Sequence, residues 1–188
     1  MRAAYTVAAS STAVTTLGFL SGDRSLVVMT ADGAVSTWGL VRRADASSGW
    51  TLIQIHTLRA HNAPVTAFAP SQRVKGFVTG DMKGNLFLHH ATSSQTLLRL
   101  ANSEFPIRAV AFAPKGDGLI ALDGAGQLSL YQVQNAYPEV TLETLFAKVW
   151  YEGYDQPAHV WQSSSGSDDV EPKLGLLPLA FGTLKGTM

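Results

Sequence analysis

Short apolar runs alternate with polar, glycine-containing turns along the first three quarters of the chain, and the whole pattern repeats. Three stretches align without a gap: VTTLGFLSGDRSLVVMTADGAVSTW from Val14, VTAFAPSQRVKGFVTGDMKGNLFLH from Val65 and IRAVAFAPKGDGLIALDGAGQLSLY from Ile107. The second stretch follows the first by 51 residues, and the third follows the second by 42. The chain therefore contains an internal repeat of one structural unit.

Each repeat predicts four short β-strands. In the second repeat the strands are expected at Val65–Ala69, Gly76–Thr79, Asn85–His89 and Thr96–Leu100, with turn residues between them. The turn before the third strand ends in a glycine, which tolerates positive φ; these glycines are Gly33, Gly84 and Gly126. Four short strands in a unit of about 40 to 45 residues are typical of a β-propeller blade. The sequence thus predicts an all-β fold, a partial β-propeller of about three four-stranded blades.

The repeats resemble WD40 repeats. The first carries Asp32-Gly33 and then Trp38, close to the family's D-G-x-V-x-V-W-D ending, and Ala60-His61 stands where the family has its Gly-His pair. In the later repeats the position of Trp38 holds a histidine or a tyrosine, and the position of Asp32 holds a lysine or an alanine. The resemblance therefore implies that the family's His–Ser/Thr–Asp–Trp hydrogen-bond network is incomplete in every repeat. His61 is expected to hydrogen-bond within its own blade.

Three blades are too few for a closed ring, because closed propellers have roughly four to eight. Residues Thr6–Ser10 match Thr57–His61 at the same spacing of 51, so the chain starts inside a junction between blades. Two interpretations stay open: further blades precede Met1, or two chains supply three blades each. Both predict association of this chain, as a homo-oligomer or larger assembly, because open sheet edges recruit other strands.

The repeat fades after Val133. One more strand is expected at Glu139–Phe146, so that the propeller blades occupy residues 1–146 and an irregular tail occupies residues 147–188. Within the tail, Ser163–Ser167 suits a flexible linker better than an oxyanion cradle, because Asp168 follows closely. An aromatic cluster, Trp150, Tyr151, Tyr154 and Trp161, suits either a membrane interface or packing against the blades.

The tail resembles the permease subunits of phosphate-type ABC transporters over about the last forty residues. The matching positions are Glu171, Pro172, Lys173, Pro178, Leu179, Phe181, Gly182, Thr183, Leu184 and Lys185. In that family this segment leads into a transmembrane helix, and some members carry a large extracytoplasmic insertion. The resemblance implies a periplasmic, WD40-like domain of a permease subunit in a bacterial inner membrane. Its partners would be other transporter subunits or the substrate-binding protein, with membrane attachment through helices outside this sequence.

The composition of the chain argues against several other classes of protein. Lys plus Arg and Asp plus Glu each number 14, so the chain lacks the basic excess that nucleic-acid binding needs. It has no cysteine, which excludes disulfides and thiol catalysis. No apolar run reaches the roughly 18 to 20 residues of a spanning helix, and the N-terminus makes a poor signal peptide.

No catalytic or cofactor-binding pattern accompanies the repeats. His56, His61, His89 and His90 lack the spacing of a metal site, and no P-loop, serine elbow or dinucleotide motif is present. We therefore expect neither enzymatic activity nor a cofactor. Two rivals to the permease domain remain: a cytoplasmic WD40 scaffold for partner proteins, and a propeller hydrolase or lyase, for which no catalytic residues are evident.

Overall fold

The fold is built from three antiparallel sheets that correspond to the three repeats. The computed structural model describes residues 6–43, 49–101, 103–134, 137–163 and 171–187. The first sheet contains β1 (Val14–Phe19), β2 (Ser25–Thr30), β3 (Val35–Arg42) and β4 (Trp50–Leu58). The second contains β5 (Val65–Pro70), β6 (Gly76–Asp81), β7 (Asn85–His90) and β8 (Gln95–Ala101). The third contains β9 (Ile107–Phe112), β10 (Gly118–Asp123) and β11 (Leu128–Gln132).

Each sheet is a meander in which strands neighbouring in sequence pair antiparallel. The expected all-β class is confirmed, and the expected strands overlap the observed ones. None of the sheets closes on itself. Among the described residues the third sheet has three strands, whereas the first and second have four.

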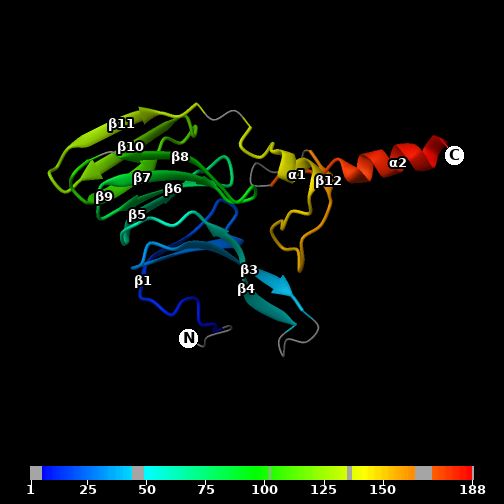
Figure 1. Ribbon diagram of the computed structural model, residues 1–188, viewed down its shortest axis with the longest axis horizontal. Helices are drawn as coiled ribbons and strands as arrows, with labels where there is room; N and C mark the ends of the chain where they lie inside the picture. The colour runs from blue at the N-terminus through cyan, green and yellow to red at the C-terminus, as the bar shows by residue number, and fades with distance from the viewer. Residues whose placement is uncertain (1–5, 44–48, 102, 135–136, 164–170, 188) are drawn as a thin grey trace.

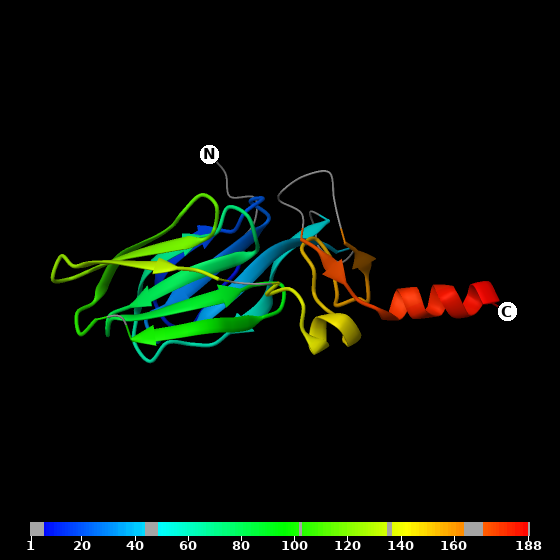
Figure 2. The ribbon, with the colours of Figure 1, turned by 90° about the horizontal axis from the view of Figure 1, so that it is seen from above.

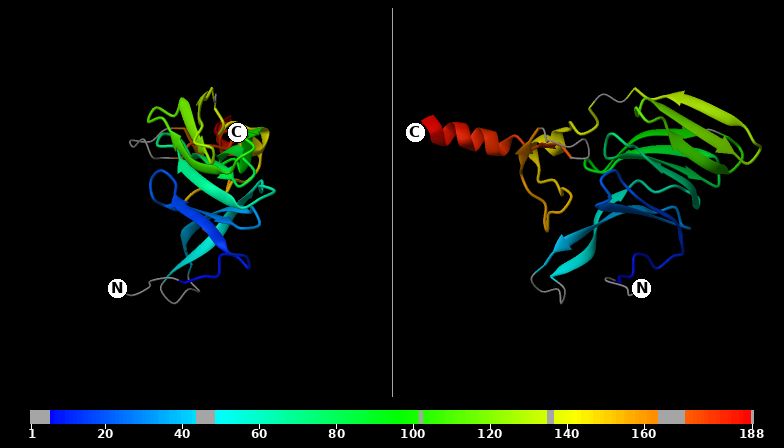
Figure 3. Two further views of the ribbon diagram at one scale, coloured as in Figure 1. Left: turned by 90° about the vertical axis from the view of Figure 1, so that its left-hand side faces the viewer. Right: turned by 180° about the vertical axis from the view of Figure 1, so that it is seen from behind.

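The sheets stack in chain order through their first strands, with β5 beside β1 on one side and β9 on the other (Figure 1). The views in Figure 3 show the same succession, from the blue first sheet through the green second sheet to the yellow-green third sheet. The second sheet is thus covered on both faces, and β6 is buried along its whole length.

Two hydrophobic cores fill the two seams between sheets. The core of the first seam consists of buried side chains from the first and second sheets: Leu20, Val27, Met29, Val35, Leu58, Val65, Phe77 and Ala91. The core of the second seam consists of buried side chains from the second and third sheets: Ala67, Ala69, Val78, Leu86, Ile107, Leu119 and Ala121. Residues at equivalent repeat positions, such as Val27 and Val78, pack in the cores of successive seams.

The prediction of a strand at Glu139–Phe146 is wrong, because this segment contains the short helix α1 (Leu142–Phe146). Thr141 and Thr144 form a reciprocal capping box, in which each backbone N–H donates to the other residue's hydroxyl, at 3.0 and 2.9 Å. The cap satisfies backbone donors that a strand would have had to pair with β11. In the described part of the chain, α1 therefore stands where the third sheet would have its fourth strand.

The tail is less irregular than expected. Its described part contains the two-residue strands β12 (Trp161–Gln162) and β13 (Lys173–Leu174), which pair with each other, and the helix α2 (Leu177–Thr187). Figure 2 shows α2 projecting away from the sheets, beyond the rest of the molecule. Among the described residues, no helix combines the length and hydropathy needed to cross a membrane.

Candidate functional site: the second-sheet network and the tail junction

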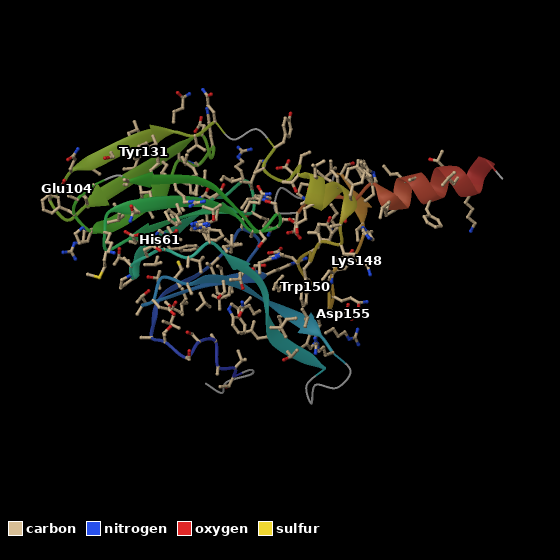
Figure 4. The ribbon with its side chains drawn as sticks, in the orientation of Figure 1. His61, Glu104, Tyr131, Lys148, Trp150 and Asp155 are labelled. Carbon is tan, nitrogen blue, oxygen red and sulfur yellow. The ribbon has the colours of Figure 1, made fainter. Side chains whose placement is uncertain are left out.

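His61, labelled in Figure 4, belongs to a chain of hydrogen bonds that runs through the second sheet. In the loop before β5, His61 Nδ1 lies 2.8 Å from Asp81 Oδ2, and its Nε2 lies 2.7 Å from Thr79 Oγ1. Thr79 Oγ1 is also 3.0 Å from His89 Nε2, and His89 Nδ1 is 3.0 Å from Thr96 Oγ1. One arrangement of protons satisfies every contact: both histidines are neutral, His61 donates to the carboxylate, and each threonine hydroxyl donates to a ring nitrogen.

The second repeat is more complete than expected: it has the His, Thr and Asp of the network, and only the tryptophan is replaced, by His89. The aspartate that matters is Asp81, not the residue aligned with Asp32, and Asp123 stands at its position in the third repeat. Asp32 itself is exposed and accepts a hydrogen bond from the hydroxyl of Thr30 within its own turn. His89 replaces the tryptophan because its Nε2–H supplies the single ring donor that an indole would supply.

The other two repeats keep only parts of the network. In the first, Trp38 donates to Ser36 Oγ at 2.9 Å, because the position of Thr79 is occupied by Val28. In the third, Ser103 donates to Asp123 Oδ2 at 2.6 Å, which reproduces the first link alone. Within the described part of the chain, the full network thus belongs to the middle sheet.

Burial keeps these histidines neutral. It lowers the pKa of His89 to about 3 and that of His90 to about 4, and it also lowers the pKa of His61, which Asp81 only partly offsets. Burial acts to raise the pKa of the Asp81 carboxyl, but hydrogen bonds from Asn85 and His61 outweigh it, and the net pKa is lowered. An ionised carboxylate bonded to a neutral imidazole, closed off from solvent, is suited to holding a sheet together rather than to proton transfer.

A metal is not favoured at these positions. In the ranges that the structure describes, no group of three or more His, Cys, Asp or Glu side chains is placed to hold a metal ion. His61 and His89 use their ring nitrogens on protein hydroxyls and a carboxylate, and His90 Nδ1 bonds Ser93 at 2.9 Å.

The glycines of the repeated turn connect successive sheets. Gly33, Gly84 and Gly126 have φ of +87°, +80° and +83°. Gly33 O accepts from His61 N–H at 2.9 Å, and Gly84 O accepts from Ser103 N–H at 3.2 Å. A Cβ at Gly33 would lie 2.3 Å from His61 O, and one at Gly84 would lie 1.9 Å from Ser103 O. A Cβ at Gly126 would meet no atom within 4 Å.

A second cluster of polar residues joins the tail to the seam between the first and second sheets. Lys75 is only 5% exposed. Its Nζ lies 2.7 Å from Glu152 Oε2 and also donates a hydrogen bond to Ser21 O. Lys75 itself lies in the loop between β5 and β6 of the second sheet. Its ammonium group thus joins this sheet to a loop of the first sheet and to the tail. Trp150, labelled beside this seam in Figure 4, accepts from His56 Nε2 at 3.1 Å through its carbonyl.

Glu171, the first residue of the permease-like motif, is buried in this cluster and is 6% exposed. Its Oε1 accepts from the hydroxyl of Thr92, in the turn after β7, and its Oε2 accepts from Glu152 N–H at 2.8 Å. Burial raises the pKa of the Glu171 carboxyl. The motif therefore begins by fixing the tail onto the second sheet.

Lys173 stabilises the inside of the tail. Its Nζ donates to Gln162 Oε1 at 2.8 Å and lies 5.8 Å and 5.9 Å from the ring centroids of Tyr151 and Tyr154. Tyr151 is 1% exposed, so packing against the protein, rather than membrane contact, describes this member of the aromatic cluster. Of the expected serine linker, only Ser163 lies within the described residues.

Apart from Pro172, which lies between Glu171 and Lys173, the rest of the motif lies on α2 and is placed differently. Pro172 is half-buried, whereas Pro178, Phe181, Gly182, Thr183, Leu184 and Lys185 are exposed. Pro178 stands in the first turn of α2, where the missing N–H of proline is tolerated. Phe181 is 77% exposed and Leu184 is 63% exposed. The structure thus separates the motif into a buried half that binds the body and an apolar half that leaves it.

Comparison with known proteins gives a limited result. No protein-family model matches the chain. The chain is similar to "Telomerase protein component 1" of Rattus norvegicus, with 31% identity over 111 residues. The match covers 59% of this chain but 4% of the length of that protein. It shows partial sequence similarity to a segment of a much longer chain.

Proposed function

We propose that this chain is a non-catalytic extracytoplasmic domain of the permease subunit of a phosphate-type ABC transporter, acting through protein–protein contacts. We further infer that its three stacked sheets are WD40-like blades of a β-propeller. In this proposal the domain faces the periplasm of a bacterium, and the attached permease lies in the inner membrane. Its partners would be transporter subunits or the substrate-binding protein.

The observation that carries the proposal is the division of the permease-like motif. Glu171 and Lys173 are 6% and 8% exposed and bind the body of the domain, whereas the residues after Leu176 leave it. Apolar side chains occur all around α2, including Leu177, Leu179 and Phe181. Only Thr183, Lys185 and Thr187 of α2 are polar, and a predominantly apolar helix suits a lipid or protein-core environment better than water. This arrangement is what an extracytoplasmic domain joined to a membrane helix would require.

The propeller part of the proposal is supported by the repeated geometry. Each sheet is an antiparallel meander, successive sheets pack through equivalent residues, and the middle sheet has the His–Thr–Asp network of the WD40 resemblance. The first strands β1, β5 and β9 lie side by side, as the inner strands of neighbouring blades do.

The test is the natural reading frame and the location of its product. We expect an apolar span to follow residue 188 and the full-length product to sediment with inner membranes, resisting extraction with carbonate. A full-length product that has no hydrophobic span and remains in the soluble fraction would overturn the permease proposal. A companion ATPase gene beside it would support it further.

A cytoplasmic WD40 scaffold is the second candidate. It is favoured by the buried network around His61, which serves a structural role and needs no membrane. Polar residues in the roughly twenty positions after residue 188 would favour this candidate, since a spanning helix needs about that many apolar residues.

A further inference from the structure

The outward face of the third sheet is apolar and exposed, although its counterpart in the second sheet is buried. Five residues of the second sheet point into the second seam and are at most 9% exposed: Ala67, Ala69, Val78, Leu86 and Leu88. Their equivalents, 42 residues later, are all exposed: Ala109, Ala111, Ile120, Leu128 and Leu130. Leu128 is 68% exposed and Leu130 is 77% exposed. We call this set the front face.

The opposite end of the stack shows the complementary exposure. Val14, Leu17 and Phe19 of β1 are 44%, 61% and 55% exposed. Their equivalents in the third sheet, Ile107, Val110 and Phe112, belong to or pack against the core of the second seam. We call Val14, Leu17 and Phe19 the back face. Each seam inside the chain is made by a front-type face packing on a back-type face, and the two end sheets leave one face of each type uncovered.

The turn glycines mark the same missing neighbour. At Gly33 and Gly84 the carbonyl of the residue that leads into the next sheet fills the space beside Cα. The corresponding space at Gly126 is empty, although its backbone has the same left-handed conformation. The residue that leads into the first sheet is Ser10, which stands 51 positions before His61. If a second copy of the chain packed at this end of the stack, its Ser10 would fill the place beside Gly126 that His61 fills beside Gly33 and Ser103 fills beside Gly84.

We propose that the front face of each chain packs on the back face of a second copy, so that two copies close a ring of six sheets. The occupant is a second copy because its back face carries apolar side chains at the repeat positions whose equivalents in the third sheet, Ile107, Val110 and Phe112, already cover a front face inside this chain. Three sheets are too few to close on themselves, whereas six lie within the roughly four to eight of closed rings. The two seams between copies would be identical and head to tail, which is compatible with a closed two-fold assembly.

This inference rests on the propeller part of the proposed function but not on the permease part. Loss of the ring would leave the membrane test unaffected. Likewise, a soluble full-length product would leave the ring intact. The two proposals therefore fail separately.

Sedimentation equilibrium of the 188-residue chain tests the ring. One chain has a mass of 20.0 kDa, so the expected species contains two such chains. Leu128→Glu and Leu17→Glu alter side chains that are exposed in the single chain, so each should fold normally yet weaken association by at least about 30-fold, the effect of losing a buried anchor. Leu142→Glu is the matched control: Leu142 is 78% exposed on α1, away from both faces, and its substitution should leave two-chain association unchanged.

Mixing the two variants shows whether the contact is head to tail. Leu128→Glu chains keep an intact back face and Leu17→Glu chains keep an intact front face, so an equimolar mixture should form a two-chain species through one seam. Either variant alone should remain a single chain. Circular dichroism confirms that each variant is folded. A single-chain wild-type protein, dimers that survive either substitution, or open assemblies of more than two chains would overturn the six-sheet ring.

Discussion

Replacing Thr79 with valine should destabilise the protein strongly, although the side-chain shape hardly changes. The Thr79 hydroxyl bonds both His61 and His89, and the residue is 0% exposed. Thr79→Val would leave one ring acceptor and one ring donor buried without partners. At about 1–3 kcal/mol for each unsatisfied buried group, the free energy of unfolding should fall by about 2–6 kcal/mol. Valine fits the site, because Val28 occupies the equivalent position in the first sheet.

Thr37→Val is the matched control. Thr37 is 2% exposed, and its hydroxyl has no hydrogen-bond partner among the described residues. The same chemical change there should alter the free energy of unfolding by less than about 1 kcal/mol, or increase it, because no bond is lost. Urea denaturation followed by tryptophan fluorescence, at one protein concentration and neutral pH, measures both variants. Equal losses in the two would refute the claim that the network stabilises the second sheet.

Three further outcomes follow from the structure. Lowering the pH from 7 to 5 should reduce the free energy of unfolding by about 2 kcal/mol for each of His89 and His90. The pKa values of His89 and His90 in the folded chain lie near 3 and 4, below the 6.5 of a free histidine, so the unfolded chain binds protons first as the pH falls. Urea denaturation measures the change, and a free energy of unfolding that stays constant from pH 7 to 5 would contradict the burial of these histidines. Gly84→Ala should lower the melting temperature more than Gly126→Ala does, since both strain the backbone but only the first places a Cβ 1.9 Å from a carbonyl oxygen; equal shifts would count against the assigned contact. Lys75→Met should lower the free energy of unfolding by up to about 3 kcal/mol, because it leaves the mostly buried carboxylate of Glu152 unpaired, and should speed proteolysis of the tail. Unchanged cleavage would show that the tail is held elsewhere.

The strands of the repeats could be predicted because their signal is local. Alternating or continuous apolar runs, bounded by turn glycines such as Gly33 and Gly84, determine where a strand begins and ends. The helix α1 was missed because the segment Glu139–Phe146 has the composition of a strand, and its capping threonines decide the outcome. The signal for that cap, Thr141 three residues before Thr144, was present but differs from the usual Ser/Thr-x-x-Glu pattern.

The hydrogen-bond network around His61 and the junction of the tail with the sheets are harder to predict from the sequence than the strands are. The buried aspartates could have been identified from the recurrence of Asp81 and Asp123 at the same repeat position. The similarity of the Asp32-Gly33 turn to the family motif instead indicates the position of Asp32, which lies two residues later in the repeat. The pairing of Lys75 with Glu152 joins residues 77 positions apart, and no spacing or pattern in the sequence marks such a contact. The repeat thus predicts what recurs, and it is silent about contacts that occur once.

The position of Lys75 has a mechanical consequence. A pull on α2 reaches the body through Glu171 and Glu152, and from there it is transmitted to the loop of Ser21 in the first sheet and to Thr92 in the second. Tension at the C-terminal helix is therefore applied across the seam between the first two sheets. The hydrogen bond from Leu176 N–H to Leu145 O, at 2.8 Å, also joins the start of α2 to α1, so the load divides between α1 and the polar junction at the first seam.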